Sequence, residues 1–365
     1  MKEARRIMKQ TDHEILADYQ CFLRRKRLSL FFMLLLLIAC FLFSLCAGSS
    51  QISLKDLVQA IMRKSSRQLN TIIWNVRMPR TVTAVVVGWT LGLSGCVMQN
   101  VLRNPLASAS TLGVSQGASF GAAAAIVCLG AGIQVNAGGT TSAIAITNPY
   151  LVTVCAFLGG IATTLLILAL SGIRGMTPGM MVLAGVAISS LFTGATTLIQ
   201  YFADDVMVAS VVYWTFGNLG RAGWRDIAIN ACLTSGASVY FYGNRWNYNA
   251  MESGANTAKS LGVHVDRLIL LSMTLCSLIA ATSVAFVGCI QFVGLIAPHI
   301  CRRFTGNDHR FLLPASALCG AMLLLLADIA SRLTIPPVVL PIGALTSFLG
   351  APLFLYLIIK GGRAA

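Results

Sequence analysis

The feature that most constrains this chain is the length of its stretches without a charged side chain. Residues 104–173 contain no Asp, Glu, Lys or Arg, and similar neutral runs cover 28–54, 175–203 and 268–301. About 20 apolar residues cross a bilayer core as a helix, so each run can hold a crossing and 104–173 can hold at least two. Only 11% of the residues are charged, against about 25% in soluble domains. We therefore predict a polytopic helical membrane protein.

Breaks at Gly, Pro and Asn, together with clusters of charge, divide the chain into about ten membrane spans. The first apolar run is longer than the core of a secretory signal and is interpreted as a retained span. Residues 1–27 then form a basic N-terminal tail, and 28–365 form the transmembrane domain. The eighth span is short enough to be a partial helix. The spans lie near 28–47, 78–102, 114–130, 149–171, 179–203, 225–243, 266–288, 293–303, 309–332 and 341–360.

The distribution of basic residues predicts the orientation. If the N-terminal tail lies inside, the segments on the inner side hold 18 of the 27 Lys and Arg residues. An excess of Lys and Arg in short loops marks the cytoplasmic side. Both termini are therefore predicted in the cytoplasm. Six of the outer cations fall in 48–80, an exception that needs a reason of its own.

The sequence offers little support for catalysis. No G-x-x-x-x-G-K-[ST] motif for ATP and no H-E-x-x-H occurs, and the two overlapping matches to G-x-S-x-G, GVSQG at 113–117 and GASFG at 117–121, have no convergent catalytic set beside them. Nearly all of the eleven cysteines lie in apolar runs without metal-ligand spacing. We predict no enzyme activity, no cofactor and no metal site in this chain, so an ATP-driven role would need a separate ATPase subunit. The net charge of +15 sits at the ends of apolar spans, and no nucleic-acid partner is expected.

The stretch RNPLASASTLGVSQGASFGA (103–122) is rich in small residues. Gly113, Gly117 and Gly121 recur every fourth position, a spacing that lets a second helix approach closely. A phosphate loop would favour a nearby Lys, and Arg103 is the only cation of this stretch. We interpret the stretch as a packing element that follows a break at Asn104-Pro105.

A faint internal repeat accompanies these spans. Gly95-Cys96 recurs as Gly288-Cys289, Pro105 as Pro298 and Gly113 as Gly306, all with an offset of 193 residues. About five spans separate the copies, so the second copy would be inverted. Inverted repeats with Gly- or Pro-interrupted helices are characteristic of transporters.

Asp328 and Arg332 are the main candidates for charge inside the membrane. Their spacing of four residues lets them pair along one helix face. One interpretation is a local ion pair near the outer end of the ninth span, which we prefer. The alternative is a coupling carboxylate at Asp328 in an ion-coupled secondary transporter. A membrane-embedded enzyme, a third possibility, lacks a convergent catalytic set.

Several long motifs follow one another along roughly residues 50–360. They are RMPR (77–80), GWTLGLSGCVMQNVLRNPLASASTLGVSQGASFGA (88–122), MVLAGVAISSLF (181–192), YWTFGNLG (213–220), TAKSLGV (257–263), FVGLIAPHICRRFTGNDHRFLLPASALCGAMLLLLADIASR (292–332) and LPIGALTSFLGAPLFLYLI (340–358). In this order they resemble one known family, the permease subunits of bacterial ABC importers for iron–siderophores, haem and cobalamin.

The resemblance implies a type II importer permease with ten spans and a dimeric permease fold in the bacterial cytoplasmic membrane. The chain would pair with a second copy of itself or with a close relative. Two cytoplasmic ATPase subunits, which bind ATP and Mg²⁺, would drive it, and an outer substrate-binding protein would deliver the cargo. A ferric siderophore is the expected cargo, with haem and cobalamin as alternatives.

The resemblance also assigns residues. Coupling to the ATPase maps onto about 250–265, where Ala255 and Asn256 replace acidic residues of the family. Docking of the binding protein maps onto Arg77, Arg80 and Arg332, with anchoring at lipid headgroups as the alternative for these arginines. The full coupling set is Gly254, Ala255, Asn256, Thr257, Ala258, Ser260, Leu261 and Gly262. The expected pathway lining is Ser189, Ser190, Thr193, Thr196, Thr197, Gln200, Thr346 and Ser347.

Overall fold

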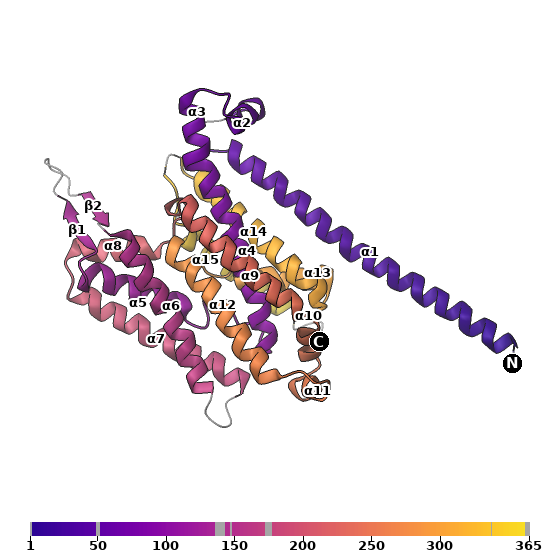
Figure 1. Ribbon diagram of the computed structural model, residues 1–365. Helices are drawn as coiled ribbons and strands as arrows, with labels where there is room; N and C mark the ends of the chain where they lie inside the picture. The colour runs from indigo at the N-terminus through magenta and orange to yellow at the C-terminus, as the bar shows by residue number, and fades with distance from the viewer. Residues whose placement is uncertain are drawn as a thin grey trace.

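The computed structural model is a nearly all-helical bundle (Figure 1). It describes residues 2–48, 52–135, 143–146, 148–171, 177–336 and 338–361. The α-helices are α1 (Lys2–Cys46), α2 (Leu54–Ile61), α3 (Arg67–Thr71), α4 (Met78–Val101), α5 (Val114–Ala123), α6 (Pro149–Ser171), α7 (Pro178–Tyr201), α8 (Asp205–Thr215), α9 (Trp224–Gly243), α10 (Arg245–Glu252), α11 (Ala255–Ser260), α12 (Val265–Val287), α13 (Val293–Thr305), α14 (His309–Leu333) and α15 (Ile342–Gly361). The π-helical segments η1 (Ile72–Arg77) and η2 (Ala124–Cys128) precede α4 and follow α5, and a 3-10 turn, η3, covers Leu219–Arg221.

Every predicted span coincides with a helix. Among the described residues, six helices are long and apolar enough to cross a membrane. The count of ten crossings is not confirmed by this measure, because α5, α9, α13 and α15 fall outside it. The eighth predicted span is α13, which is short, as expected. The six are Gln20–Cys46, Arg67–Val101, Pro149–Leu170, Pro178–Tyr201, Val265–Val287 and His309–Leu333.

Helix α4 forms the centre of the bundle, and small residues let its neighbours approach closely. A Cβ atom added at Gly88 would strike the carbonyl oxygen of Gly320 in α14, and one at Gly92 would strike that of Ser316. The two backbones therefore nearly touch along this seam. The same holds between α4 and α13, where Gly95 meets the backbone of Gly294.

The small residues of the stretch 103–122 pack as predicted, with one difference. Cβ atoms at Gly117 and Gly121 would strike the carbonyl oxygens of Gly159 and Cys155 in α6, which confirms a close helix pair. Gly113 instead precedes α5 with a φ of 87° and faces Ser189 of α7. Only glycine adopts such a φ without strain, so Gly113 serves the turn rather than the α5–α6 seam.

The offset of 193 residues does not pair equivalent positions. Gly95 lies inside α4, whereas Gly288 ends α12 with a φ of 84°. Pro298 lies inside α13, while Pro105 lies in the turn after α4. These identities therefore do not mark corresponding residues of two structural halves.

The segment 131–148, predicted as a flexible outer loop, contains an antiparallel strand pair. Strand β1 (Gly132–Val135) pairs with β2 (Ala143–Ile146), with Gly132 opposite Ile146. Residues 136–142 and 147 lie outside the described residues. The pair lies beside α8 at the same end of the bundle as α2 and α3 (Figure 1).

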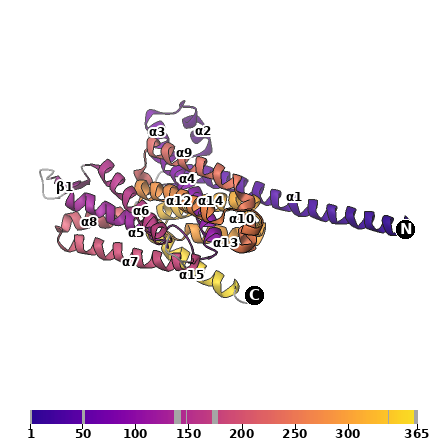
Figure 2. The ribbon, with the colours of Figure 1, turned by 60° about the horizontal axis from the view of Figure 1, so that its bottom comes forward.

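Helix α1 runs without a break through the predicted boundary at residue 27. Its 45 residues give a length of about 68 Å at 1.5 Å per residue, more than twice the hydrocarbon core of a bilayer. The N-terminal part of α1 leads away from the bundle (Figures 1 and 2). Helices α5 to α8 form the opposite side of the molecule.

Candidate functional site

Asp328 is fully buried between two arginines near the end of α14. Its Oδ1 accepts a hydrogen bond of 2.7 Å from Arg80 Nε of α4, and its Oδ2 lies 3.0 Å from Arg332 Nε. The second distance is that of an ion pair, although the N–H direction does not make it a hydrogen bond. The predicted ion pair within α14 is confirmed. Arg80, which lies 248 residues away in sequence, is the partner that sequence spacing could not show.

Two arginines hold the last turn of α1. Arg77 donates to the carbonyl oxygens of Leu45 and Cys46 at 2.8 and 2.9 Å. Arg332 donates to Ala47 O at 2.9 Å and to Ser44 Oγ at 2.7 Å. The last carbonyl groups of a helix lack partners within it, and cations are favourable there. The arginines therefore join α1 to η1, which leads directly into α4, and to α14.

The three arginines expected at an outer docking rim are largely buried. Arg77 is 6% exposed, and the side chains of Arg80 and Arg332 are 14% and 10% exposed. Their donors are directed to the end of α1 and to Asp328. Their role in docking stays a prediction.

A polar cavity of about 410 Å³ opens between α5, α7, the end of α8 and the start of α15. Thr193, Thr196, Thr197 and Gln200 of α7 line one wall, and their spacing of three, one and three residues places them on one helix face. Ser347 of α15 lines the opposite part. The structure thus brings together five of the eight residues predicted for the pathway.

The threonines present acceptors to this cavity. The hydroxyl of Thr193 donates to Ser189 O at 2.8 Å, that of Thr196 to Phe192 O at 2.8 Å and that of Thr197 to Thr193 O at 3.0 Å. Each hydroxyl has a single proton, and that proton is used within α7. Each threonine therefore offers lone pairs to the cavity, whereas the Gln200 amide can both donate and accept, and the wall carries no charge.

Three predicted lining residues lie elsewhere. The Ser189 hydroxyl donates to Gly185 O and faces the turn at Gly113. Ser190 is exposed and outside the cavity lining. Thr346 is buried at 7% exposure, and its hydroxyl donates to Gly343 O. The cavity does not include them.

Helix α5 and the turn after α12 supply the lining that sequence reasoning missed. Ser115, Gln116 and Ser119 line the cavity from the α5 face that does not pack on α6, and Gln291 lines it from the turn. Gln116 Oε1 is buried without a hydrogen-bond partner in the described part of the chain. The motif SQGAS (115–119) could have indicated this lining, because its polar residues lie between the glycines that pack against α6.

The turn between α12 and α13 is fixed by unusual backbone angles. Gly288 and Phe292 have φ values of 84° and 65°, and a Cβ at Gly288 would meet Trp214 O at 2.5 Å. Cys289 Sγ lies 3.2 Å from Ser119 Oγ and donates to Ser115 O. The turn is therefore packed against α5, where it shapes the cavity.

The segment predicted to couple to an ATPase forms the short helix α11 at the opposite end of the bundle from α2 and α3 (Figure 1). Gly254 and Gly262, with φ values of 113° and 84°, lie on either side of it. Ala258 is fully buried and anchors the helix, whereas Leu261 is 68% exposed. The segment thus exposes the apolar side chain of Leu261 at the end of a short helix that lies between two glycines with positive φ.

Helix α10 ties this segment to the core. Asn100 of α4 donates to Tyr248 O at 3.1 Å and to Glu252 Oε1 at 3.2 Å. Asn249 Nδ2 donates to Asp308 at 3.0 Å. Burial raises the pKa of Asp308, but hydrogen bonds from Arg310 and Asn249 outweigh it and lower the pKa to about 2. Hydrogen bonds thus join α10, which directly precedes α11, to α4 and to the start of α14.

Comparison with known proteins decides the family. The profile of the FecCD transport family matches residues 36–360. The chain belongs to this family. It is 49% identical to a Methanocaldococcus jannaschii protein named as the ABC transporter permease MJ0087, over 95% of this chain and 98% of that protein. The sequence resemblance to ABC permeases is confirmed.

Two named transport proteins and one solved structure are also similar. The chain is 36% identical to the hemin transport permease HmuU of Yersinia pestis over 92% of this chain and 96% of that one. It is 35% identical to the vitamin B12 import permease BtuC of Escherichia coli, over 90% and 94%. A structure described as a metal-chelate type ABC transporter in an inward-facing conformation matches with a TM-score of 0.78 and 31% identity, over 91% and 98%. The all-helical permease fold is confirmed.

Proposed function

We propose that this chain is the permease subunit of an ATP-driven importer that moves a metal chelate across the cytoplasmic membrane. The cavity between α5, α7 and α15 carries the proposal. It has about 410 Å³ of space, weakly polar walls and no charged lining residue among those described. A wall that binds its cargo weakly allows release, whereas tight binding would slow passage.

The cargo class follows from the relatives. The related permeases named above transport hemin and vitamin B12, and both cargos are large metal-containing rings. A ferric siderophore is the first cargo to test, with haem and cobalamin beside it. The chain itself needs no cofactor in this proposal, since ATP and Mg²⁺ act on the partner ATPase.

Three surfaces of the bundle are assigned to partners: its two ends and the exposed face of α7. Two ATPase subunits would dock at α11, where Leu261 is exposed, together with Asn256, Thr257 and Ser260. A substrate-binding protein would dock at the other end, near Arg80 and the α2–α3 region. Helix α7 exposes apolar side chains along its length, among them Leu183 and Tyr201 at 73% and 80%. A second permease copy would cover this face, with lipid around the rest.

We infer that α11 and both ends of the chain lie in the cytoplasm. The two termini and α11 lie toward the same end of the molecule (Figure 1). The N-terminal part of α1, a basic segment in the sequence, leads toward that end (Figure 1), and an excess of positive charge favours the cytoplasmic side.

The alternative, an ion-coupled secondary transporter that uses Asp328, has less support. A coupling carboxylate must bind and release its ion, whereas Asp328 is 0% exposed and held by Arg80 and Arg332. Neutralisation of Asp328 by a bound proton would break its buried ion pairs with both arginines, which is strongly unfavourable. We therefore do not favour this mechanism.

Co-reconstitution tests the proposal. The chain is placed in proteoliposomes with its ATPase and binding protein, and uptake of ferric siderophore, haem and cobalamin is measured with ATP or with an ion gradient alone. We expect uptake of one cargo only with ATP, and loss of it in Leu261→Asp. Val338→Asp, at an apolar position that is 58% exposed against 68% for Leu261 and lies away from α11, is the control. Uptake driven by the gradient alone would refute the proposal.

A further inference from the structure

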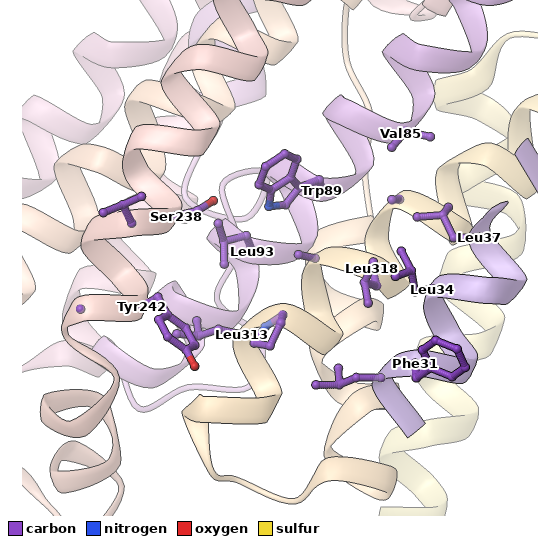
Figure 3. A pocket seen from close by; sticks show the side chains of 16 residues that line it. Phe31, Leu34, Leu37, Val85, Trp89, Leu93, Ser238, Tyr242, Leu313 and Leu318 are labelled. Carbon is purple, nitrogen blue, oxygen red and sulfur yellow. The ribbon is translucent and has the colours of Figure 1, made fainter. Parts of the chain in front are cut away.

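A second cavity lies apart from the proposed pathway, between α1 and α9. It has a volume of about 850 Å³, and all but a few of its lining side chains are apolar. Figure 3 shows α9 with Ser238 and Tyr242 on one side and α1 with Phe31, Leu34 and Leu37 on the other. Trp89 lies on the floor between them. The groove keeps α1 and α9 apart, so its apolar walls are not covered by contact between these two helices.

The length of the groove limits what can fill it. Lining positions run from Leu30 to Leu37 on α1, from Val85 to Leu93 on α4 and from Leu313 to Ala321 on α14. At 1.5 Å per residue these stretches are about 10–12 Å long. A transmembrane helix needs about 30 Å, whereas one bilayer leaflet contributes about half of that. The groove therefore matches an acyl chain of one leaflet and is too short for a spanning helix.

Basic residues lie beyond one end of the groove on α1, on α14 and at the start of α10, which follows α9. Lys26 lies four residues before Leu30 and Arg310 four before Pro314, spacings that place each cation on the same helix face as its lining neighbour, one turn beyond it. Arg245 is the first residue of α10, and its guanidinium lies over the ring of the lining residue Tyr242. Lys26 is itself buried at 5% exposure, and Arg310 pairs with Asp308 at 2.7 Å. Positive charge thus converges at the mouth.

Arg245 is the cation best placed to meet a ligand there. Its guanidinium lies 4.5 Å from the Tyr242 ring centroid and 5.8 Å from that of Trp246. Its Nη1 donates to Tyr242 O, while its Nε has no hydrogen-bond partner among the described residues. Trp246 is 55% exposed beside it, as is typical of tryptophan at the headgroup level.

We propose that the groove between α1, α4, α9 and α14 binds one anionic phospholipid, with an acyl chain along Trp89 and the phosphate at Arg245. This mouth lies toward the same end of the bundle as α11, and anionic lipids give the cytoplasmic leaflet its negative surface potential. The proposal needs only that the chain is embedded in a membrane, so it stands apart from the cargo.

Fluorescence of Trp89 tests the site. The full chain is reconstituted in nanodiscs of phosphatidylcholine with increasing fractions of phosphatidylglycerol that carries brominated acyl chains, which quench tryptophan on contact. The signal of Trp89 is the difference between the wild type and Trp89→Phe. We expect half-quenching at a fraction about fivefold lower than with brominated phosphatidylcholine, the factor for one cation near an anionic surface.

Three variants separate the headgroup from the groove. Arg245→Gln should remove most of the preference for phosphatidylglycerol, whereas Arg267→Gln, an exposed arginine away from the groove, should leave it unchanged. Ser238→Phe fills the groove and should abolish quenching by both lipids. Each variant is compared only if it elutes as the wild type does on size exclusion.

Two outcomes would overturn the proposal. Equal quenching by both lipids, unaffected by Arg245→Gln, would show an apolar cleft that does not recognise a phosphate. Absence of any Trp89 quenching in nanodiscs would show that protein, either a second chain or α1 itself, closes the groove.

Discussion

The two polar regions of the bundle differ in how their groups are satisfied. Around Asp328, charges pair across helices: Arg80 comes from α4, and Arg332 also reaches α1. Along the α7 wall of the cavity, the threonine hydroxyls bond only to their own helix, as Thr193 does to Ser189. The charges of the first region join three helices, whereas the threonines of α7 join none.

The difference suggests that separate groups of residues determine the stability of the bundle and the transport of cargo. Loss of one member of a buried ion pair leaves an uncompensated charge, which is strongly destabilising. A threonine that bonds to its own backbone can be removed with little effect on the contacts between helices. We therefore expect stability to depend on the charges at α14, and transport to depend on the shape of the cavity.

The largest expected effect is that of Asp328→Asn. It leaves Arg80 and Arg332 buried without their carboxylate, and the free energy of unfolding should fall by about 3–5 kcal/mol. Chemical or thermal unfolding in detergent measures this. Asp266→Asn, an exposed acid that pairs with Lys259 at 3.6 Å, should cost less than about 1 kcal/mol. Equal effects of the two variants would contradict a structural role for the cluster.

A smaller loss of stability is expected for Arg77→Met. The variant removes two hydrogen bonds to the last turn of α1 together with the charge that makes them, so no unpaired buried cation is left. The free energy of unfolding should fall by about 1.5–3 kcal/mol, the value of one hydrogen bond to a charged group. The same unfolding assay applies, with Arg67→Met on exposed α3 as control. If docking alone explained Arg77, this variant would unfold like the wild type.

The cavity should show the opposite pattern. Thr197→Trp narrows it and should lower cargo uptake at least about tenfold, the effect of a barrier of about 1.4 kcal/mol. The free energy of unfolding should stay within about 0.5 kcal/mol of the wild type, as for other surface changes. Leu166→Trp, on the exposed face of α6, should change neither quantity. Normal uptake by Thr197→Trp would show that the cargo does not pass through this cavity.

The smallest expected effect is the pH dependence of the unfolding free energy that Asp308 contributes, near the predicted ATPase-coupling end. The pKa of Asp308 is lowered from 3.8 to about 2, so its ionised form stabilises the fold above the unfolded value. That contribution is lost as pH falls through the folded value. The difference in unfolding free energy between wild type and Asp308→Asn should be constant from about pH 8 to about pH 5 and shrink below about pH 4. A difference that changes near neutral pH would point to another group.

Much of the fold follows from the sequence because the bilayer imposes long apolar helices. The spans at α6 and α12 could be placed within a few residues. Helix α8 was not predicted, since its eleven residues are too few for a crossing. The strand pair at 131–148 was also missed, because its Gly-rich sequence has no clear alternation.

The site was predictable only in part. The spacing of Thr193, Thr196 and Gln200 on α7 indicates one face, and the family resemblance says which face matters. The contribution of Gln291 depends on a turn with positive φ at Phe292, which no local pattern shows for a phenylalanine. Likewise the burial of Arg80 depends on Asp328, and such distant pairs cannot be derived from a single sequence.

The central claim is that a separate ATPase drives this chain. Purification of the tagged chain from its native membrane in mild detergent, followed by mass spectrometry, tests it most directly. We predict a stoichiometric partner with a P-loop motif, and its loss in Leu261→Asp. A chain that elutes alone, from membranes that still accumulate cargo under an ion gradient without ATP, would contradict the account.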